Sequence, residues 1–403
     1  MDSIELQPNN DNSDVSLSAS SERIFNLLIN VPMFVIRFIR LLLFCLFLLP
    51  GSITFVWHYL TCDRKALYYG PRNSEYKDKN PSFSRQYIDV YGSQSNNNQS
   101  SQSSPKPVVI FVCGGAWTIG YKMWATLLAR ALVPFNIIVC IPDYRNFPGV
   151  NIKGMVHDID TSIQWVFDNI ERYGGNKNKV VLAGQSAGAH IGGVVVAMKV
   201  LDWIRREGGR SQVVDTDDTS ISSLHLNSTY APHQLCGFIS TSSPSNLVSM
   251  RPIFHQLGLS EDVQRCIFGD SFETYSPYHL LQKSAKLLDI SNIDQELRDI
   301  VPAMCVIHGT EDNTVPVNEA YQFISLLKEL SIPTEKRFYS NWSHTDPIFE
   351  EPYRGNHLYH RDVYELVCLW TNTKAEQFDE SKHILKPICP SLLVGAARFC
   401  NPF

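Results

Sequence analysis

The pentapeptide at residues 184–188, G-Q-S-A-G, constrains the fold of this chain more than any other feature. A β-rich run at 180–183 precedes it, and a helix-compatible stretch at 187–200 follows it. A sharp strand-to-helix turn of this kind holds a serine in a strained, exposed position, and small neighbours let the backbone pass closely. The context predicts that Ser186 is a nucleophile on such a turn. The alternative is a small-residue turn without chemistry, which a matching base, acid and oxyanion-binding loop elsewhere in the chain would argue against.

Short apolar runs rich in β-branched residues recur along the chain and are typical of strands buried on both faces of a parallel sheet. These runs lie at 108–112, 137–141, 180–183, 235–240 and 303–307. Between them are stretches with apolar residues at helical spacing, which are clearest from 320 to 330. The pattern predicts an α/β fold with a mostly parallel sheet and helices on both faces. A hydrophobic content of 44% is enough for a large core.

Candidate acid and base residues follow the last two predicted strands. Asp312 lies in the loop after 303–307, where a carboxylate can orient an imidazole and stabilise its protonated form. His344 lies in the loop after 337–339 and is the candidate base. The order Ser, Asp, His along the chain is the order that α/β-hydrolases use. The neighbouring alternatives for these two roles are Glu311, His357 and His360.

An oxyanion hole needs backbone N–H groups that point at the developing alkoxide. One donor is expected from Ala187, the residue after the nucleophile. The glycine-containing loop 113–117 directly follows the strand 107–112, and it predicts two more donors, Gly115 and Ala116. The alternative for this loop is an ordinary Gly-Gly turn.

The remaining composition excludes several classes of function. No His, Cys or Asp cluster has metal-ligand spacing, so no metal or cofactor is predicted. His190, behind the pentapeptide, and His308, in the turn before Asp312, are expected to pack in the protein. The net charge is −5 and no basic patch is present, so nucleic acid is not an expected partner. Ten cysteines without a C-x-x-C pair favour a reducing compartment.

An apolar segment near the N-terminus predicts attachment to a membrane. Residues 31–57 are apolar apart from Arg37 and Arg40, and 41–57 carry no charge, which is the short limit for a span. Pro50-Gly51 would either break the segment into a re-entrant hairpin or kink a single span. The alternative is a buried helix of the globular domain. The larger group of cations lies downstream and favours a cytosolic catalytic domain. These cations are Arg64, Lys65, Arg72, Lys77 and Lys79.

Three motifs together resemble those of the isoprenylcysteine α-carbonyl methylesterases, which are membrane-bound α/β-hydrolases of the carboxylesterase and lipase branch. They are V-C-G-G-A-W-T-I-G-Y-K at 112–122, D-Y-R-N-F-P at 143–148 and G-Q-S-A-G-A-H at 184–190. The resemblance covers residues 107–370. One departure is Cys113, which stands where the wider lipase branch has histidine, so other contacts must anchor the oxyanion loop.

The resemblance implies an esterase that demethylates the C-terminal prenylated cysteine of proteins at endoplasmic reticulum and Golgi membranes. It implies Ser186 as nucleophile, Asp312 as acid and His344 as base, and it places Gln185 beside the ester. Prenylated protein or prenylcysteine methyl ester and membrane lipid are the expected partners. A microsomal lipase or carboxylesterase, or an arylformamidase-like hydrolase with the same triad, is the alternative. A non-catalytic scaffold is disfavoured because every part of the machinery is present.

The sequence predicts five segments along the chain. They are a polar N-terminus at 1–30, a membrane-anchoring segment at 31–62, a connecting segment with a low-complexity loop at 63–104, the catalytic domain at 105–372 and a weakly packed extension at 373–403. The polar stretch 206–232 is expected to be an insertion. The C-terminal Cys400-Asn401-Pro402-Phe403 fits a prenylation signal poorly, because Asn and Pro replace its aliphatic residues.

Overall fold

The computed structural model describes residues 39–70, 84–93, 104–207, 226–288, 293–378 and 386–401. The polar N-terminus, most of the low-complexity loop and most of the predicted insertion lie outside these residues, and so does the end of the C-terminal motif. The chain divides into two compact units, residues 1–49 with 392–402, and residues 50–391. The five-segment division stays a prediction.

The second unit contains an eight-stranded sheet in the order β1-β2-β4-β3-β5-β6-β7-β8. The pairs β1–β2 and β2–β4 are antiparallel. The remaining pairs, from β4–β3 along the sheet to β7–β8, are parallel. The strands are β1 Arg64–Tyr68, β2 Tyr87–Tyr91, β3 Lys106–Val112, β4 Ile138–Pro142, β5 Gly175–Gln185, β6 Leu235–Thr241, β7 Ala303–Gly309 and β8 Thr334–Tyr339. The predicted mostly parallel α/β fold is confirmed.

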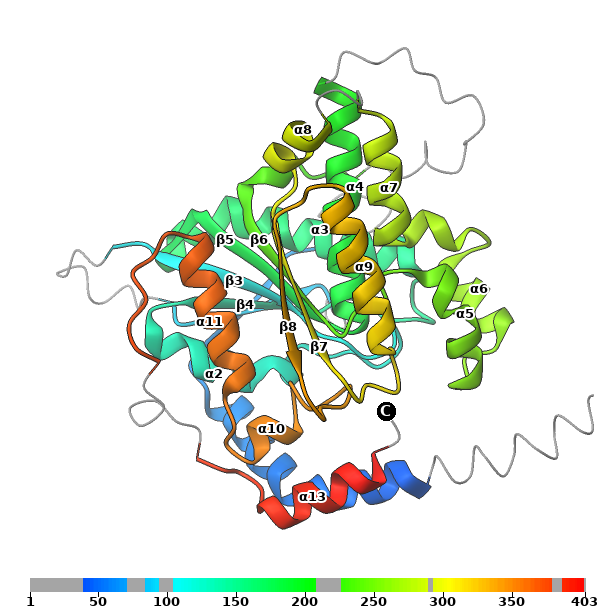
Figure 1. Ribbon diagram of the computed structural model, residues 1–403. Coiled ribbons are helices and arrows are strands. Elements are labelled where there is room, and N and C mark those ends of the chain that lie inside the picture. The colour runs from blue at the N-terminus through cyan, green and yellow to red at the C-terminus, as the bar shows by residue number, and fades with distance from the viewer. Residues whose placement is uncertain are drawn as a thin grey trace, which may run out of the picture. The chain divides into compact units, whose positions relative to one another are not determined.

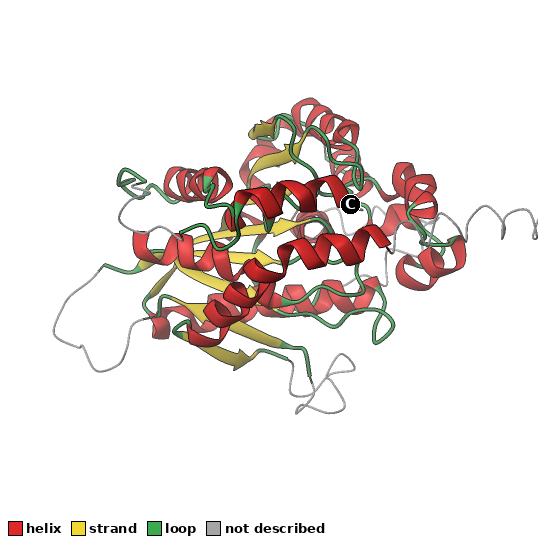
Figure 2. Ribbon diagram, turned by 90° about the horizontal axis from the view of Figure 1, so that it is seen from below, coloured by secondary structure: helices red, strands yellow, loops and turns green. Residues whose placement is uncertain are grey.

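Helices cover both faces of this sheet (Figures 1 and 2). The α-helices of the second unit are α2 Thr126–Leu132, α3 Ile152–Asn169, α4 Ala187–Glu207, α5 Leu247–Gln256, α6 Glu261–Phe268, α7 Pro277–Lys286, α8 Ile293–Ile300, α9 Val317–Glu329, α10 Glu350–Tyr353 and α11 Leu358–Trp370. Short 3₁₀ helices are η2 Lys122–Ala125, η3 Val133–Phe135, η4 Ile170–Tyr173, η5 Pro232–Gln234 and η6 Phe272–Tyr275.

Alternate residues of the central strands feed two separate cores. On β3, Val108 and Ile110 pack with α3, α4 and α9 on one face, whereas Val109 and Phe111 pack with α2 and α11 on the other. Side chains of a strand point to opposite faces with a period of two, so a strand covered on both sides must be apolar throughout. This is why the predicted runs carry no polar alternation.

Two helices are long and apolar enough to cross a membrane by length and composition, Ile39–Thr61 and Ala187–Arg206. In the second, 94% of its apolar window is buried, so it is a core helix. The first is continuous through Pro50 and Gly51, which excludes the hairpin alternative at these residues. In the first unit, α13 (Ser391–Cys400) forms a helix where the sequence predicted a weakly packed extension.

Candidate active site

Ser186 stands between the last residue of β5 and the first residue of α4, with a left-handed φ of 54°. Its N–H donates to the carbonyl of Thr241 on β6 at 2.8 Å, which fixes the turn to the sheet. A Cβ atom on Gly184 would lie 2.7 Å from the nitrogen of Ala189, and one on Gly188 would clash with the Val112 carbonyl. The small residues therefore permit a strained turn, and non-glycine left-handed backbone is typical of functional sites.

The loops after β7 and β8 bring Asp312 and His344 to this serine. His344 Nε2 lies 2.7 Å from Ser186 Oγ, and His344 Nδ1 lies 2.8 Å from Asp312 Oδ2. All three residues are at most 9% exposed. Glu311 is exposed, and His357 and His360 contact each other on and beside α11. The arrangement therefore joins the three predicted residues and none of the alternatives.

The surroundings of Asp312 favour its charged form. Burial alone would raise the pKa of this carboxyl, but His344 and the hydrogen bonds that Asp312 accepts hold it below its usual value. Its Oδ1 accepts from the amides of Thr314 and Val315 at 2.9 and 2.8 Å. His308, expected to pack in this turn, contacts Oδ2 at 3.4 Å and donates from Nε2 to the Val315 carbonyl at 2.8 Å. A charged, fixed carboxylate can hold His344 in one tautomer.

The placement of Gln185 beside the ester stays a prediction, and the structure shows which protein group its side chain contacts. Its Nε2 donates to the carbonyl of His344 at 3.2 Å, and the residue is buried. A Cβ atom on Gly114 would clash with the Gln185 side-chain oxygen, so this amide lies against the oxyanion loop. Gln185 thus ties the strand of the nucleophile to the loop of the base.

The loop after β3 has three consecutive left-handed residues, Gly115 at 133°, Ala116 at 47° and Trp117 at 61°. The amides of Thr118 and Ile119 both donate to the Gly115 carbonyl at 2.9 Å and close the turn. Across the described residues, the amides of Gly115 and Ala116 donate to no protein group. Ala187 is the first residue of α4, where helix N–H groups lack intrahelical acceptors. These amides are available to an incoming oxyanion.

Trp117 links the oxyanion loop to the helix that follows the nucleophile, a contact that the sequence motifs did not reveal. Its Nε1–H donates to His190 Nδ1 at 3.2 Å, and His190 Nε2–H donates to the Tyr275 carbonyl at 2.7 Å. Burial lowers the pKa of His190 to about 4, so the ring is neutral at physiological pH. The Trp117 ring also meets Phe254 and Phe268 edge-on, with centroids 5.4 and 4.8 Å away.

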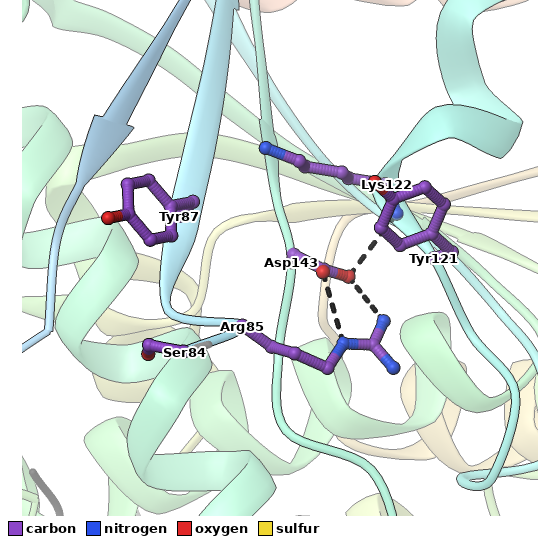
Figure 3. Close-up of a pocket in the computed structure, with 6 residues that line it drawn as sticks. All are labelled: Ser84, Arg85, Tyr87, Tyr121, Lys122 and Asp143. Carbon is purple, nitrogen blue, oxygen red and sulfur yellow. Dashed lines mark hydrogen bonds and ion pairs between the residues drawn. The ribbon is translucent and has the colours of Figure 1, made fainter. Parts of the chain in front are cut away.

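A second set of contacts holds the far end of the loop, beside an open cavity of about 440 Å³ (Figure 3). Arg85 binds the Asp143 carboxylate through Nε at 3.1 Å and Nη2 at 2.6 Å, and also donates to the Gly120 carbonyl. The amide of Lys122 donates to Asp143 at 3.3 Å. Burial raises the pKa of Asp143 to about 6, against the opposing effect of Arg85. These contacts give Asp143 a structural role.

Neighbouring contacts complete this support. Tyr144 donates to the Cys113 carbonyl at 3.0 Å, and Asn146 donates to the carbonyls of Thr118 and Gly120, both at 3.0 Å. They add to the anchoring by Cys113, whose thiol donates to the Lys122 carbonyl at 3.7 Å. Among the described residues, no group of three or more His, Cys, Asp or Glu side chains is arranged to hold a metal ion.

Comparisons with known proteins show the family of this chain. The BD-FAE family model matches residues 89–327. The chain is 32% identical to isoprenylcysteine alpha-carbonyl methylesterase ICME of Arabidopsis thaliana over 323 residues, covering 78% of this chain and 69% of that protein. It is 31% identical to the probable isoprenylcysteine alpha-carbonyl methylesterase ICMEL1 of the same organism, covering 91% and 68%.

Solved structures show the same fold. Esterase 2 of Thermogutta terrifontis superposes with a TM-score of 0.52 at 19% identity, covering 78% of this chain and 97% of that one. An esterase B from Lactobacillus rhamnosis gives 0.56 at 13% identity, covering 80% and 92%. The chain therefore belongs to the isoprenylcysteine alpha-carbonyl methylesterases, within the BD-FAE group of α/β-hydrolases, and is a carboxylic ester hydrolase.

Proposed function

We propose that this chain is a membrane-bound serine esterase that hydrolyses the methyl ester of prenylated C-terminal cysteine. In this proposal Ser186 is the nucleophile, His344 the base and Asp312 the acid. The observation that carries it is the unbroken hydrogen-bonded series from Asp312 through His344 to Ser186 Oγ, with distances of 2.8 and 2.7 Å. Such a series activates a serine hydroxyl for attack on an ester.

The reaction proceeds in two acyl-transfer steps. His344 Nε2 takes the proton of Ser186 as Oγ bonds to the ester carbonyl carbon, and the amides of Gly115, Ala116 and Ala187 stabilise the oxyanion. The tetrahedral intermediate collapses, its bond to methoxide breaks, and His344 returns the proton so that methanol leaves. A water molecule, deprotonated by His344, then attacks the acyl-enzyme and releases the carboxylate and the free serine. Asp312 stays ionised throughout.

The proposed location is the cytosolic side of endoplasmic reticulum and Golgi membranes. The helix Ile39–Thr61 has a mean hydropathy of 2.2 over its apolar window, which supports membrane attachment. The described residues include all ten cysteines and contain no disulfide, which is compatible with a reducing compartment. A prenyl chain partitions into the bilayer, so attachment would bring the enzyme to its substrate.

A substrate panel tests this proposal. Full-length protein in detergent is assayed against farnesylcysteine methyl ester, short p-nitrophenyl esters and N-formylkynurenine, with Ser186→Ala as the inactive reference. We expect the highest kcat/KM on the prenylcysteine methyl ester. Preference for the short esters would indicate the general carboxylesterase or lipase alternative, and preference for the formyl compound would indicate the arylformamidase-like one.

A further inference from the structure

The helix Ile39–Thr61 has an apolar exposed face along its whole length. Exposed side chains recur every three or four residues, which places them on one stripe. They are Ile39, Leu42, Leu46, Leu49, Ile53, Val56 and Leu60, with Leu43 and Trp57 beside them. The opposite stripe is buried and consists of Phe44, Leu48, Gly51, Phe55 and Tyr59. The helix is therefore covered on one side only.

In the second unit, the buried stripe of residues 50–61 packs on the hydrolase body. Phe55 contacts the ring of Tyr353, with centroids 6.2 Å apart, and a Cβ atom on Gly51 would lie 2.5 Å from the same ring. Tyr59 donates its hydroxyl to Asp89 Oδ2 on β2 at 3.3 Å. This half of the helix is thus an integral part of the catalytic unit.

That packing is incompatible with a single transmembrane span. A helix of 23 residues is about 34 Å long, close to the ~30 Å of a bilayer's hydrocarbon core, so a span would place nearly all of it in hydrocarbon. Lys122 Nζ lies 2.6 Å from Asp89 Oδ1, and Asp89 also accepts the hydrogen bond from Tyr59. A span would place this charged pair and the edge of the sheet close to the hydrocarbon core. Charged groups and sheet edges are costly there.

The first unit carries a second apolar surface on α13. Leu392 and Phe399, seven residues apart and so on one face, are 84% and 87% exposed, whereas Val394 and Ala397 are fully buried. Arg40 Nη2 donates to the Asn401 carbonyl at 2.7 Å, so the C-terminal end of α13 meets the N-terminal end of the apolar helix.

We propose that the exposed apolar face of the helix Ile39–Thr61 inserts into one leaflet of a lipid bilayer, as a monotopic docking surface, and that the exposed face of α13 also binds lipid. The inference rests on the membrane attachment included in the proposed function. The occupant is lipid because no charge interrupts residues 41–62, an exposed Trp57 suits the membrane interface, and the exposed Arg40 near the start of the helix matches anionic headgroups. The N-terminus and the hydrolase unit therefore lie on the same side of the membrane.

Topology provides the first test. A Ser18→Cys variant of the full chain is expressed, and sealed microsomes are treated with a membrane-impermeant PEG-maleimide. The exposed Cys266 on α6 reports the side of the hydrolase unit. In intact vesicles we expect the reagent to label Cys266 and, in the Ser18→Cys variant, to form one further adduct at residue 18. An adduct that forms only after detergent is added would show a span and overturn the proposal.

Charge on the two faces provides the second test. Leu46→Glu with Ile53→Glu, and separately Leu392→Glu with Phe399→Glu, should each lower partition onto phosphatidylcholine–phosphatidylserine vesicles about tenfold or more, because carboxylates resist transfer into lipid. Leu369→Glu, at a leucine 62% exposed on α11, is the matched control and should bind as wild type. Circular dichroism confirms folding.

Self-association and esterase activity of the same variants separate this proposal from its alternatives. Glutamate variants that keep vesicle binding but lose self-association would identify a second copy as the occupant and overturn the proposal. Hydrolysis of prenylcysteine methyl ester in detergent should be unchanged in all these variants. A failure of the wild type to hydrolyse that ester would count against the proposed function alone, since labelling and partition do not depend on it.

Discussion

The acid–base side and the oxyanion side of the candidate site are held in different ways. On the acid–base side the proposed chemistry belongs to side-chain atoms, and Asp312 and His344 touch the reacting serine or each other directly. On the oxyanion side the proposed donors are backbone amides of Gly115 and Ala116, and a side chain of the same loop, Trp117, donates to His190 on α4 and not to the serine.

This difference predicts how each side responds to substitution. A changed side chain on the acid–base side removes a reacting group outright. On the oxyanion side the amide remains after any substitution other than proline, and only its position changes. Losses of kcat should therefore be large on the acid–base side, where a reacting group is removed. They should be smaller on the oxyanion side, where a donor is only displaced.

The largest expected effect is that of Asp312→Asn. The amide cannot stabilise the protonated imidazole and favours the wrong tautomer of His344, so kcat should fall about 10⁴-fold with little change in folding. Steady-state kinetics on the preferred ester measure it. The control is Glu311→Gln, one residue away and exposed, which should keep wild-type kcat. Equal losses in the two variants would remove Asp312 from the acid role.

An intermediate effect is expected for Gly115→Ala. The added Cβ would clash with the Gly120 nitrogen at a φ of 133°, so the loop must move and its donors with it. Displacing an oxyanion donor costs about 10²- to 10³-fold in kcat. Gly258→Ala is the matched control because its φ is 100° and nothing lies within 4 Å of the new Cβ. Comparable losses of activity in both variants would point to general backbone strain.

The same contrast explains what the sequence could predict. The fold and the positions of Asp312 and His344 follow from local signals, namely apolar runs and the polar residues that end them. The Trp117–His190 contact joins residues 73 positions apart, and no local periodicity encodes it. The edge strand β1 and its neighbour β2 were also not predicted, because RKALY and YIDVY carry polar residues that mask a strand pattern. Such features depend on packing, which only the folded chain supplies.

A smaller effect is expected where side chains hold the oxyanion loop from behind. Trp117→Phe keeps an aromatic side chain but removes the donor to His190, and His190→Ala removes the acceptor. Each should lower kcat up to about tenfold with KM nearly unchanged, since a misplaced amide weakens binding of the transition state more than of the ester. In the double variant the losses should be less than additive, as for two partners in one bond. Strict additivity would mean that the hydrogen bond does not position the loop.

The smallest effect concerns stability and pH. Burial lowers the pKa of His190 from 6.5 to about 4. The imidazole therefore binds a proton below about pH 6.5 in the unfolded chain, but only below about pH 4 in the folded chain. Stability from this group is thus complete above pH 6.5 and declines as the pH falls through that window. Between pH 7 and 5.5 the wild type should lose about 1 kcal/mol more unfolding free energy than His190→Gln, which cannot take up the proton.

Urea titrations of both proteins in detergent at several pH values measure this difference. Other buried groups titrate equally in both chains, so they cancel in the comparison. Parallel pH profiles would mean that His190 takes up its proton in the folded state near its ordinary pKa. The ring would then be charged in mildly acidic solution and unable to accept from Trp117, and the oxyanion side would lose its link to α4.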